Sequence, residues 1–406
     1  MTTNELLDTW NQCGTDFDTF ANLITNISDS TFAQLVDLAD ATLYHVVESD
    51  ENSLKFHVFD SRYSCMNGVP SRTNLNLVKA RSNGVTDELI EEIKDGKLMM
   101  RLCSGKARPT SRHLSRDLAA RAMLSGESVY DPTEERDAYF MSRYCATKAQ
   151  SNAILRKSDG GTCKIIALPS KSYCHVRQDI LLEIVAFLQK ELGEMECATW
   201  YVDNFISKVW LRFPKQAEDI AAVYQLPDSD FLVPGVLLET SDTGDCSIRA
   251  SAFWEYKHRS RGRIGFYERD HRGTITSGDI IAGVRNKLLP KYTELPKRLA
   301  ELLTVDIQDP AAAVAMCMKM ANAKIRDRLS NRVMKGLVEQ LQMEVDGAQD
   351  MTGYDIAMLF LDLPARVTNT DGSIKETVEK LAGAVPFLDF DRISSATSAV
   401  PLPPTV

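Results

Sequence analysis

The sequence lacks the motifs that usually carry enzyme chemistry. It contains neither GxxxxGK[ST] nor GxGxxG, the loops that hold nucleotide phosphates, and its six histidines form neither HExxH nor another metal-binding cluster. A serine nucleophile has no GxSxG context. We therefore predict a protein that is not an enzyme, that needs no cofactor and that holds no tightly bound zinc, iron or nucleotide.

Paired cysteines and long apolar runs are also missing. The nine cysteines are scattered without a CxxC pair, so neither a zinc site nor a disulfide framework is expected. The first residues, MTTNELLDTWNQCG, lack the basic and apolar regions of a signal peptide, and no apolar run approaches the ~18 residues of a membrane span. These absences predict a cytoplasmic protein with no membrane partner.

One enzymatic alternative remains open, because a metal-dependent nuclease needs only a few convergent carboxylates. Asp228, Asp230, Glu239 and Asp242 are the candidates for such a site. Their spacing alone does not show that they converge.

The pattern of apolar residues predicts an α+β protein built mostly of antiparallel hairpins with flanking helices. A chain of 406 residues is too long for one ordinary core. We expect an α+β region over 1–158, a central hairpin and helix domain over 159–304, a helical region over 305–393 and a disordered tail over 394–406.

Several local expectations follow from turn residues and periodicity. Hairpins are predicted over 41–63 and 231–259, and an amphipathic helix over 175–192 that ends at Gly193. Ser30 is expected to cap a helix over 30–40, Ser277 to cap another, and a single long helix is expected over 310–345. The polar stretch 64–84 is predicted to be a long loop.

Charge is distributed unevenly along the chain, whose net charge is −9. Residues 249–298 carry 12 Lys/Arg against 5 Asp/Glu, while 101–121 and 319–335 each carry six against one. Such segregation is expected when one surface binds a polyanion and the rest stays acidic.

The segment 249–298 also interleaves cations with aromatic residues, a combination that suits single-stranded nucleic acid because cations follow phosphates and rings stack on unpaired bases. The alternative is an ordinary hairpin with aromatic residues in the core and arginines in water. The predicted nucleic-acid-binding residues are Lys257, Arg259, Arg261, Arg263, Arg269, Arg272, Tyr256 and Tyr267, together with Arg108 and Arg112 from the first basic segment.

Residues 160–300 resemble a phage- and plasmid-encoded family that is known as a domain of unknown function. The matching positions are Thr240, Ser241 and Gly244 in the hairpin, Phe253 in its second strand, the Asp270-His271-Arg272 string, and Tyr173 and Val176 before the helix. The Cys-Asn-Gly of that family is missing, since YKHRSRG stands in its place.

The resemblance implies a phage or plasmid origin. With this origin, its order of elements and its basic aromatic segment, the chain is similar to the single-strand annealing proteins of the RecT and Red-beta kind. Those proteins act as oligomers without a cofactor. We therefore expect a DNA-metabolism protein that binds single-stranded DNA as a homo-oligomer. Single-strand annealing is the role that the resemblance suggests. A virion structural protein (a capsid or capsid-associated subunit) is the alternative, and a host-interaction or anti-defence protein is a third hypothesis.

Overall fold

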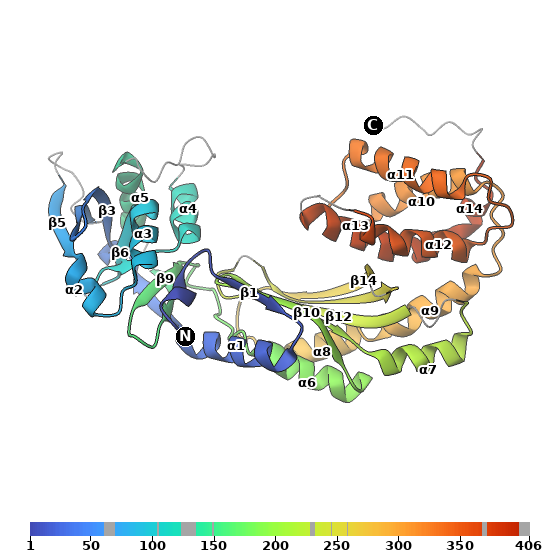
Figure 1. Ribbon diagram of the computed structural model, residues 1–406, viewed down its shortest axis with the longest axis horizontal. Coiled ribbons are helices and arrows are strands. Elements are labelled where there is room, and N and C mark those ends of the chain that lie inside the picture. The colour runs from blue at the N-terminus through green and yellow to red at the C-terminus, as the bar shows by residue number, and fades with distance from the viewer. Residues whose placement is uncertain are drawn as a thin grey trace.

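The computed structural model describes residues 1–60, 70–103, 105–122, 135–147, 150–227, 232–244, 246–257, 259–367 and 372–397. Three antiparallel sheets and many helices make up this part of the chain, and helices alone follow the last strand, so the predicted α+β class is confirmed. Figure 1 shows an arch in which an N-terminal lobe and a C-terminal helical lobe rise at the two ends of a central sheet. No helix among the described residues is long and apolar enough to cross a membrane.

The central sheet has six strands in the order β1-β10-β11-β12-β13-β14. Its strands are β1 (Asn11–Gly14), β10 (Glu196–Asp203), β11 (Ile206–Arg212), β12 (Leu232–Ser241), β13 (Ile248–Tyr256) and β14 (Ser260–Arg269). Side chains alternate between its two faces, and one face packs with α1 (Phe17–Ser30), α6 (Ile180–Leu192) and α8 (Ser277–Lys287) around a hydrophobic core. We call this the helix-covered face, and the other the opposite face.

The predicted hairpin over 231–259 and the further strand after it are confirmed as β12, β13 and β14. The helix predicted over 175–192 is confirmed from Ile180 onward as α6, and Gly193 ends it with a positive φ. Thr276 rather than Ser277 caps α8, because Thr276 and Asp279 form a reciprocal capping box.

The N-terminal lobe contains the other two sheets, with the strand orders β5-β4-β3-β6-β7 and β2-β8-β9. Its strands are β2 (Thr31–Asp37), β3 (Thr42–Ser49), β4 (Ser53–Asp60), β5 (Ser71–Asn76), β6 (Leu98–Arg101), β7 (Arg108–Pro109), β8 (Gln150–Lys157) and β9 (Cys163–Ala167). Its helices are α2 (Leu77–Ser82), α3 (Asp87–Gly96), α4 (Arg112–Arg121) and α5 (Glu135–Thr147). The hairpin predicted over 41–63 is therefore confirmed as β3 and β4 over its described residues.

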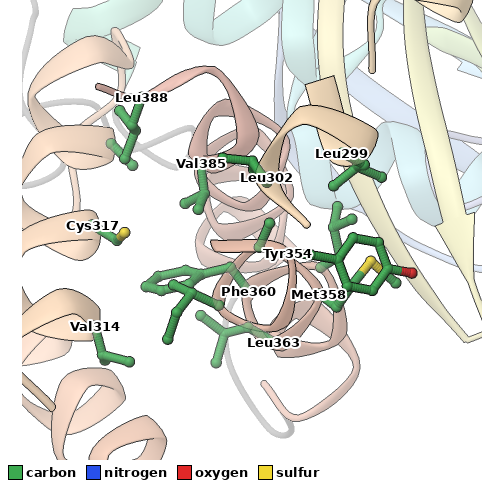
Figure 2. Packing of buried hydrophobic residues seen from close by; sticks show 14 of the residues in the cluster. Leu299, Leu302, Val314, Cys317, Tyr354, Met358, Phe360, Leu363, Val385 and Leu388 are labelled. Carbon is green, nitrogen blue, oxygen red and sulfur yellow. The ribbon is translucent and has the colours of Figure 1, made fainter. Parts of the chain in front are cut away.

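The C-terminal lobe surrounds the largest hydrophobic core, part of which is shown in Figure 2. Its helices are α9 (Pro290–Leu302), α10 (Pro310–Lys324), α11 (Asn331–Val345), α12 (Gly353–Asp362), α13 (Gly372–Ala384) and α14 (Phe390–Ser394), while α7 (Pro214–Tyr224) packs nearby. The lobe is joined to the sheet at β14, where a Cβ added to Gly383 would lie 1.9 Å from the carbonyl oxygen of Arg263. Only glycine allows α13 to approach β14 this closely.

Three local predictions were wrong. Residues 31–37 form the strand β2 instead of a helix, because pairing with β8 overrides the helix propensity of Ala33, Gln34 and Leu35. The helix expected over 310–345 is interrupted at 325–330, where Ser330 caps α11. The stretch 64–84 contains β5 and α2, while its first residues, 64–69, lie outside the described part.

One predicted domain boundary falls inside a β-hairpin and the other falls between two helices. The boundary after residue 158 lies inside the β8–β9 hairpin, and the boundary after residue 304 lies between α9 and α10. Strand β1 and helix α1 belong to the central sheet and its core although they precede the N-terminal lobe in the sequence. Most of the predicted tail, 398–406, lies outside the described residues.

Candidate nucleic-acid interface

A row of polar side chains crosses the opposite face of the central sheet. The strand registers align Tyr201, Lys208, Glu239, Arg249 and Glu268 on five neighbouring strands. Lys208 pairs with Glu239 at 2.9 Å, and Arg249 with Glu268 at 3.0 Å. The Tyr201 hydroxyl is partly buried and donates to Asp203, so its pKa rises to about 12 and it stays a neutral donor.

Aromatic rings stand beside this row. Trp210 and Phe266 lie in the adjacent row of the same face, separated by Leu237 and Ser251. Phe266 is 68% exposed, although its neighbour Tyr267 points into the core on the helix-covered side. An exposed phenylalanine beside arginines on a sheet presents a flat ring to a ligand that can stack on it.

All three basic segments border this face. The first contains α4, which approaches the β10–β11 turn through the rings of His113 and Phe205, 5.4 Å apart. The third contains the connection 325–330, where Lys380 donates to Asp327 at 3.0 Å and lowers the pKa of that carboxyl. Lys380 lies on α13, which also pairs with Arg263 of β14 through Glu376 and Glu379, so the third segment lies near the second. In Figure 1, α4 and α13 stand at opposite ends of the sheet.

Within the predicted site, three of the arginines form ion pairs with carboxylates. Arg259 binds Asp362 through two nitrogens, at 3.0 and 3.3 Å. Arg261 binds Glu255 at 3.0 Å, and its guanidinium lies 5.8 Å from the centre of the Trp210 ring. Pairing alone does not take an arginine away from solvent, because the side chains of Arg259 and of the similarly paired Arg249 stay 59% and 39% exposed. Arg261 and Arg263, at 22% and 10%, are enclosed and hold the molecule together.

Arg263 is the most enclosed of the three arginines. It pairs with Glu376 at 3.0 Å and with Glu379 at 2.9 Å, both on α13. Burial raises the pKa of Glu379, while burial of Glu376 is outweighed by Arg263 and Lys380, which lower the pKa of that carboxyl. These contacts attach the C-terminal lobe to β14.

Neither predicted tyrosine presents its ring to solvent. Tyr256 is 5% exposed and belongs to the core of the C-terminal lobe, and Tyr267 is 8% exposed in the core of the central sheet. Base stacking by these two rings would require opening a core, so the structure leaves Phe266 as the exposed ring of the segment.

The other predicted cations are exposed or half-buried but scattered. Lys257 lies at the β13–β14 turn, whereas Arg269 and Arg272 lie at the far end of β14. Arg269 pairs with Ile248, a residue of the helix-covered core, so its side chain leaves the sheet on that side. Arg112 of α4 binds Asp95 at 3.2 Å, and Arg108 is half-buried on β7. The ten predicted residues therefore do not line one groove.

The residues predicted from the sequence do not include Phe266, Trp210 and Arg249, which the strand registers bring together on the opposite face. The signal was present, because alternation along β13 already separates Arg249 and Ser251 from the core-facing Ile248 and Ala250. Extending this alternation across β14 places Phe266 opposite Ser251.

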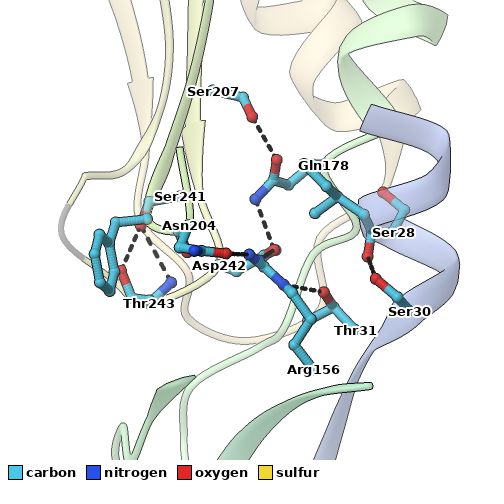
Figure 3. Close-up of polar contacts among 12 residues, drawn as sticks. Ser28, Ser30, Thr31, Arg156, Gln178, Asn204, Ser207, Ser241, Asp242 and Thr243 are labelled. Carbon is cyan, nitrogen blue, oxygen red and sulfur yellow. Dashed lines mark hydrogen bonds and ion pairs between the residues drawn. The ribbon is translucent and has the colours of Figure 1, made fainter. Parts of the chain in front are cut away.

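A buried polar cluster lies where the sheet meets the N-terminal lobe, at the end of β12 (Figure 3). Asp242 accepts from Arg156 of β8 at 3.0 Å and from Gln178 at 2.6 Å. Arg156 also donates to Asn204 and Thr31, and it is completely buried. Burial opposes ionisation of Asp242, but hydrogen bonding with His175 and the charge of Arg156 outweigh it and lower its pKa.

Tyr173, Gly244 and His271, three of the positions compared with the phage and plasmid family, lie together at this cluster. The Tyr173 and His271 rings stack 5.0 Å apart, and the Tyr173 hydroxyl donates to the Asp242 carbonyl at 3.0 Å. Gly244 has a positive φ, and an added Cβ would lie 3.4 Å from the Tyr173 ring. These three positions thus support one another structurally at the junction of two sheets.

Of the four carboxylates considered for a nuclease, the two that the structure describes do not converge. Glu239 lies on the opposite face with Lys208, whereas Asp242 lies on the helix-covered side with Arg156. Asp228 and Asp230 lie outside the described residues. Among the residues that the structure describes, no group of three His, Cys, Asp or Glu could hold a metal ion.

Comparisons of the chain with protein-family models, with curated proteins and with solved structures find no match.

Proposed function

We propose that this chain binds single-stranded DNA across the opposite face of its central sheet, between α4 and α13. The observation that carries the proposal is the arrangement around that face. Three basic segments distant in the sequence border one sheet surface from which Phe266 projects with 68% exposure.

The chemistry favours single strands over duplex. An exposed ring can stack only on bases that are not already paired, while neighbouring cations follow the phosphates. Phe266 and Trp210 supply rings, and Arg249 supplies a half-exposed cation next to them. Such binding needs no cofactor, which fits strand annealing in phage or plasmid DNA metabolism.

Replacing Phe266 tests the stacking part of the proposal. Phe266→Ala should weaken single-strand binding by about 1–3 kcal/mol and leave the salt dependence of binding unchanged. Phe140→Ala is the matched control, because Phe140 is also exposed (41%) but lies on α5 in the N-terminal lobe. Equal affinities of the two variants, measured by fluorescence anisotropy, would contradict the proposal.

Replacing Arg249 tests the phosphate part. Arg249→Gln should reduce the slope of log K against log salt by about 0.7, as expected for one lost phosphate contact on a single strand. Arg285→Gln is the control, since Arg285 is also paired with a glutamate, Glu191, but lies on the helix-covered side. A slope that changes equally in both variants would remove Arg249 from the site.

A further inference from the structure

Strand β2 is an edge strand with an exposed, uncharged surface. It pairs with β8 on one side, and in the order β2-β8-β9 it has no neighbour on the other. The four consecutive residues Phe32, Ala33, Gln34 and Leu35 are all exposed, with Phe32 at 41% and Leu35 at 57%. Within the described part of the chain, residues 32–36 make no backbone hydrogen bond except to β8.

This edge lacks the features that protect edge strands from pairing with other chains. Natural edges carry lysine or proline, or are interrupted by a bulge. The segment TFAQLVD has none of these residues, and its register with β8 runs without a shift over all seven positions. A flat, unprotected edge of this length is suited to pair with another strand.

The sequence of β2 is complementary to itself. In an antiparallel pair related by a two-fold axis at Gln34, Phe32 faces Val36 of the second copy and Ala33 faces Leu35. Gln34 then faces its own equivalent, and the only charged residue, Asp37, faces Thr31. Each larger apolar side chain meets another apolar side chain, and no like charges oppose each other.

We propose that two copies of this chain associate through antiparallel pairing of their β2 strands, centred on Gln34. The two three-stranded sheets become one continuous six-stranded sheet across the dimer. The inference does not depend on the proposed DNA binding, because β2 belongs to the N-terminal lobe and not to the central sheet.

Charges on the edge should abolish the dimer. Wild-type protein should sediment as a dimer, and Phe32→Lys/Leu35→Lys should sediment as a monomer with an unchanged circular dichroism spectrum, because both side chains are exposed. Met343→Lys is the control, since Met343 is 75% exposed on α11. A monomeric wild type, or a double variant that dimerises like the wild type, overturns the proposal.

A cross-link tests the register. Residues directly opposite each other in an antiparallel pair have Cα atoms about 4.5–5.5 Å apart, within the range of a disulfide. Gln34→Cys, in a chain with Cys13 and Cys65 replaced by serine, should therefore form a covalent dimer on mild oxidation. Adding Phe32→Lys/Leu35→Lys should prevent it. Absence of the cross-link in Gln34→Cys contradicts pairing centred on this residue.

Discussion

The two ends of β14 carry the same kind of side chain and use it differently. At its start and in the preceding turn, Arg259, Arg261 and Arg263 are bound to carboxylates of β13 and of the C-terminal lobe. Toward its end, Phe266 and Arg269 are exposed. A run of arginines in a sequence therefore contains both cations that hold lobes together and cations that face solvent, and only the partners distinguish them.

Removing an arginine from the start of the strand should have the largest effect. Arg263→Ala should lower the free energy of unfolding by about 3–5 kcal/mol, because the buried Glu379 loses its charged partner. Arg269→Ala should change it by less than about 0.5 kcal/mol, because that side chain is exposed. Chemical denaturation of both variants measures the difference, and equal destabilisation would remove the distinction between the two ends.

A methyl group at the interface of α13 should have the next largest effect. Gly383→Ala should destabilise the protein by about 1–3 kcal/mol or more, because the new Cβ would collide with the backbone of Arg263. Gly336→Ala on α11 is the control, since no atom lies within 4 Å of an added Cβ there, and it should stabilise by up to about 1 kcal/mol. Thermal melting of both variants gives the comparison, and two variants of equal stability would show that α13 does not pack this closely on β14.

The buried cluster at the end of β12 should give a smaller, pH-dependent effect. Burial lowers the pKa of His271, which is surrounded by Asp242, His175 and the Cys174 carbonyl, so the unfolded chain binds a proton there more readily than the folded protein. The free energy of unfolding should therefore fall as the pH drops through about 6.5, the ordinary value of histidine.

The contribution of Asp242 lies at lower pH. Its folded pKa is lowered, so the stability that it contributes is present above about pH 4 and is lost only below that pH.

His271→Phe tests the contribution of His271. It keeps a ring stacked on Tyr173 and removes the titrating group, so it should flatten the profile of unfolding free energy between about pH 7 and pH 5. A profile as steep as that of the wild type would assign the effect to other groups.

Sequence patterns predicted the elements whose interactions are local. The hairpin of β12 and β13 is marked by alternation and by a turn that includes Gly244, and α6 by its apolar spacing. The strand β2 was missed because its partner β8 lies far along the chain. The ion pairs of Arg259 and Arg263 were missed for the same reason, since Asp362, Glu376 and Glu379 are more than a hundred residues away. Local charge shows where cations gather but not which carboxylates the fold brings to them.

The most direct measurement of the central claim is binding of the wild-type protein to matched single- and double-stranded oligonucleotides over a range of salt concentrations. We expect tighter binding to the single strand, and an affinity that falls as the salt concentration rises. The slope of log K against log salt should change by about 0.7 for each phosphate contacted. Absence of binding to single strands, or equal affinity for duplex at every salt concentration, would contradict the assignment of the opposite face as a single-strand interface.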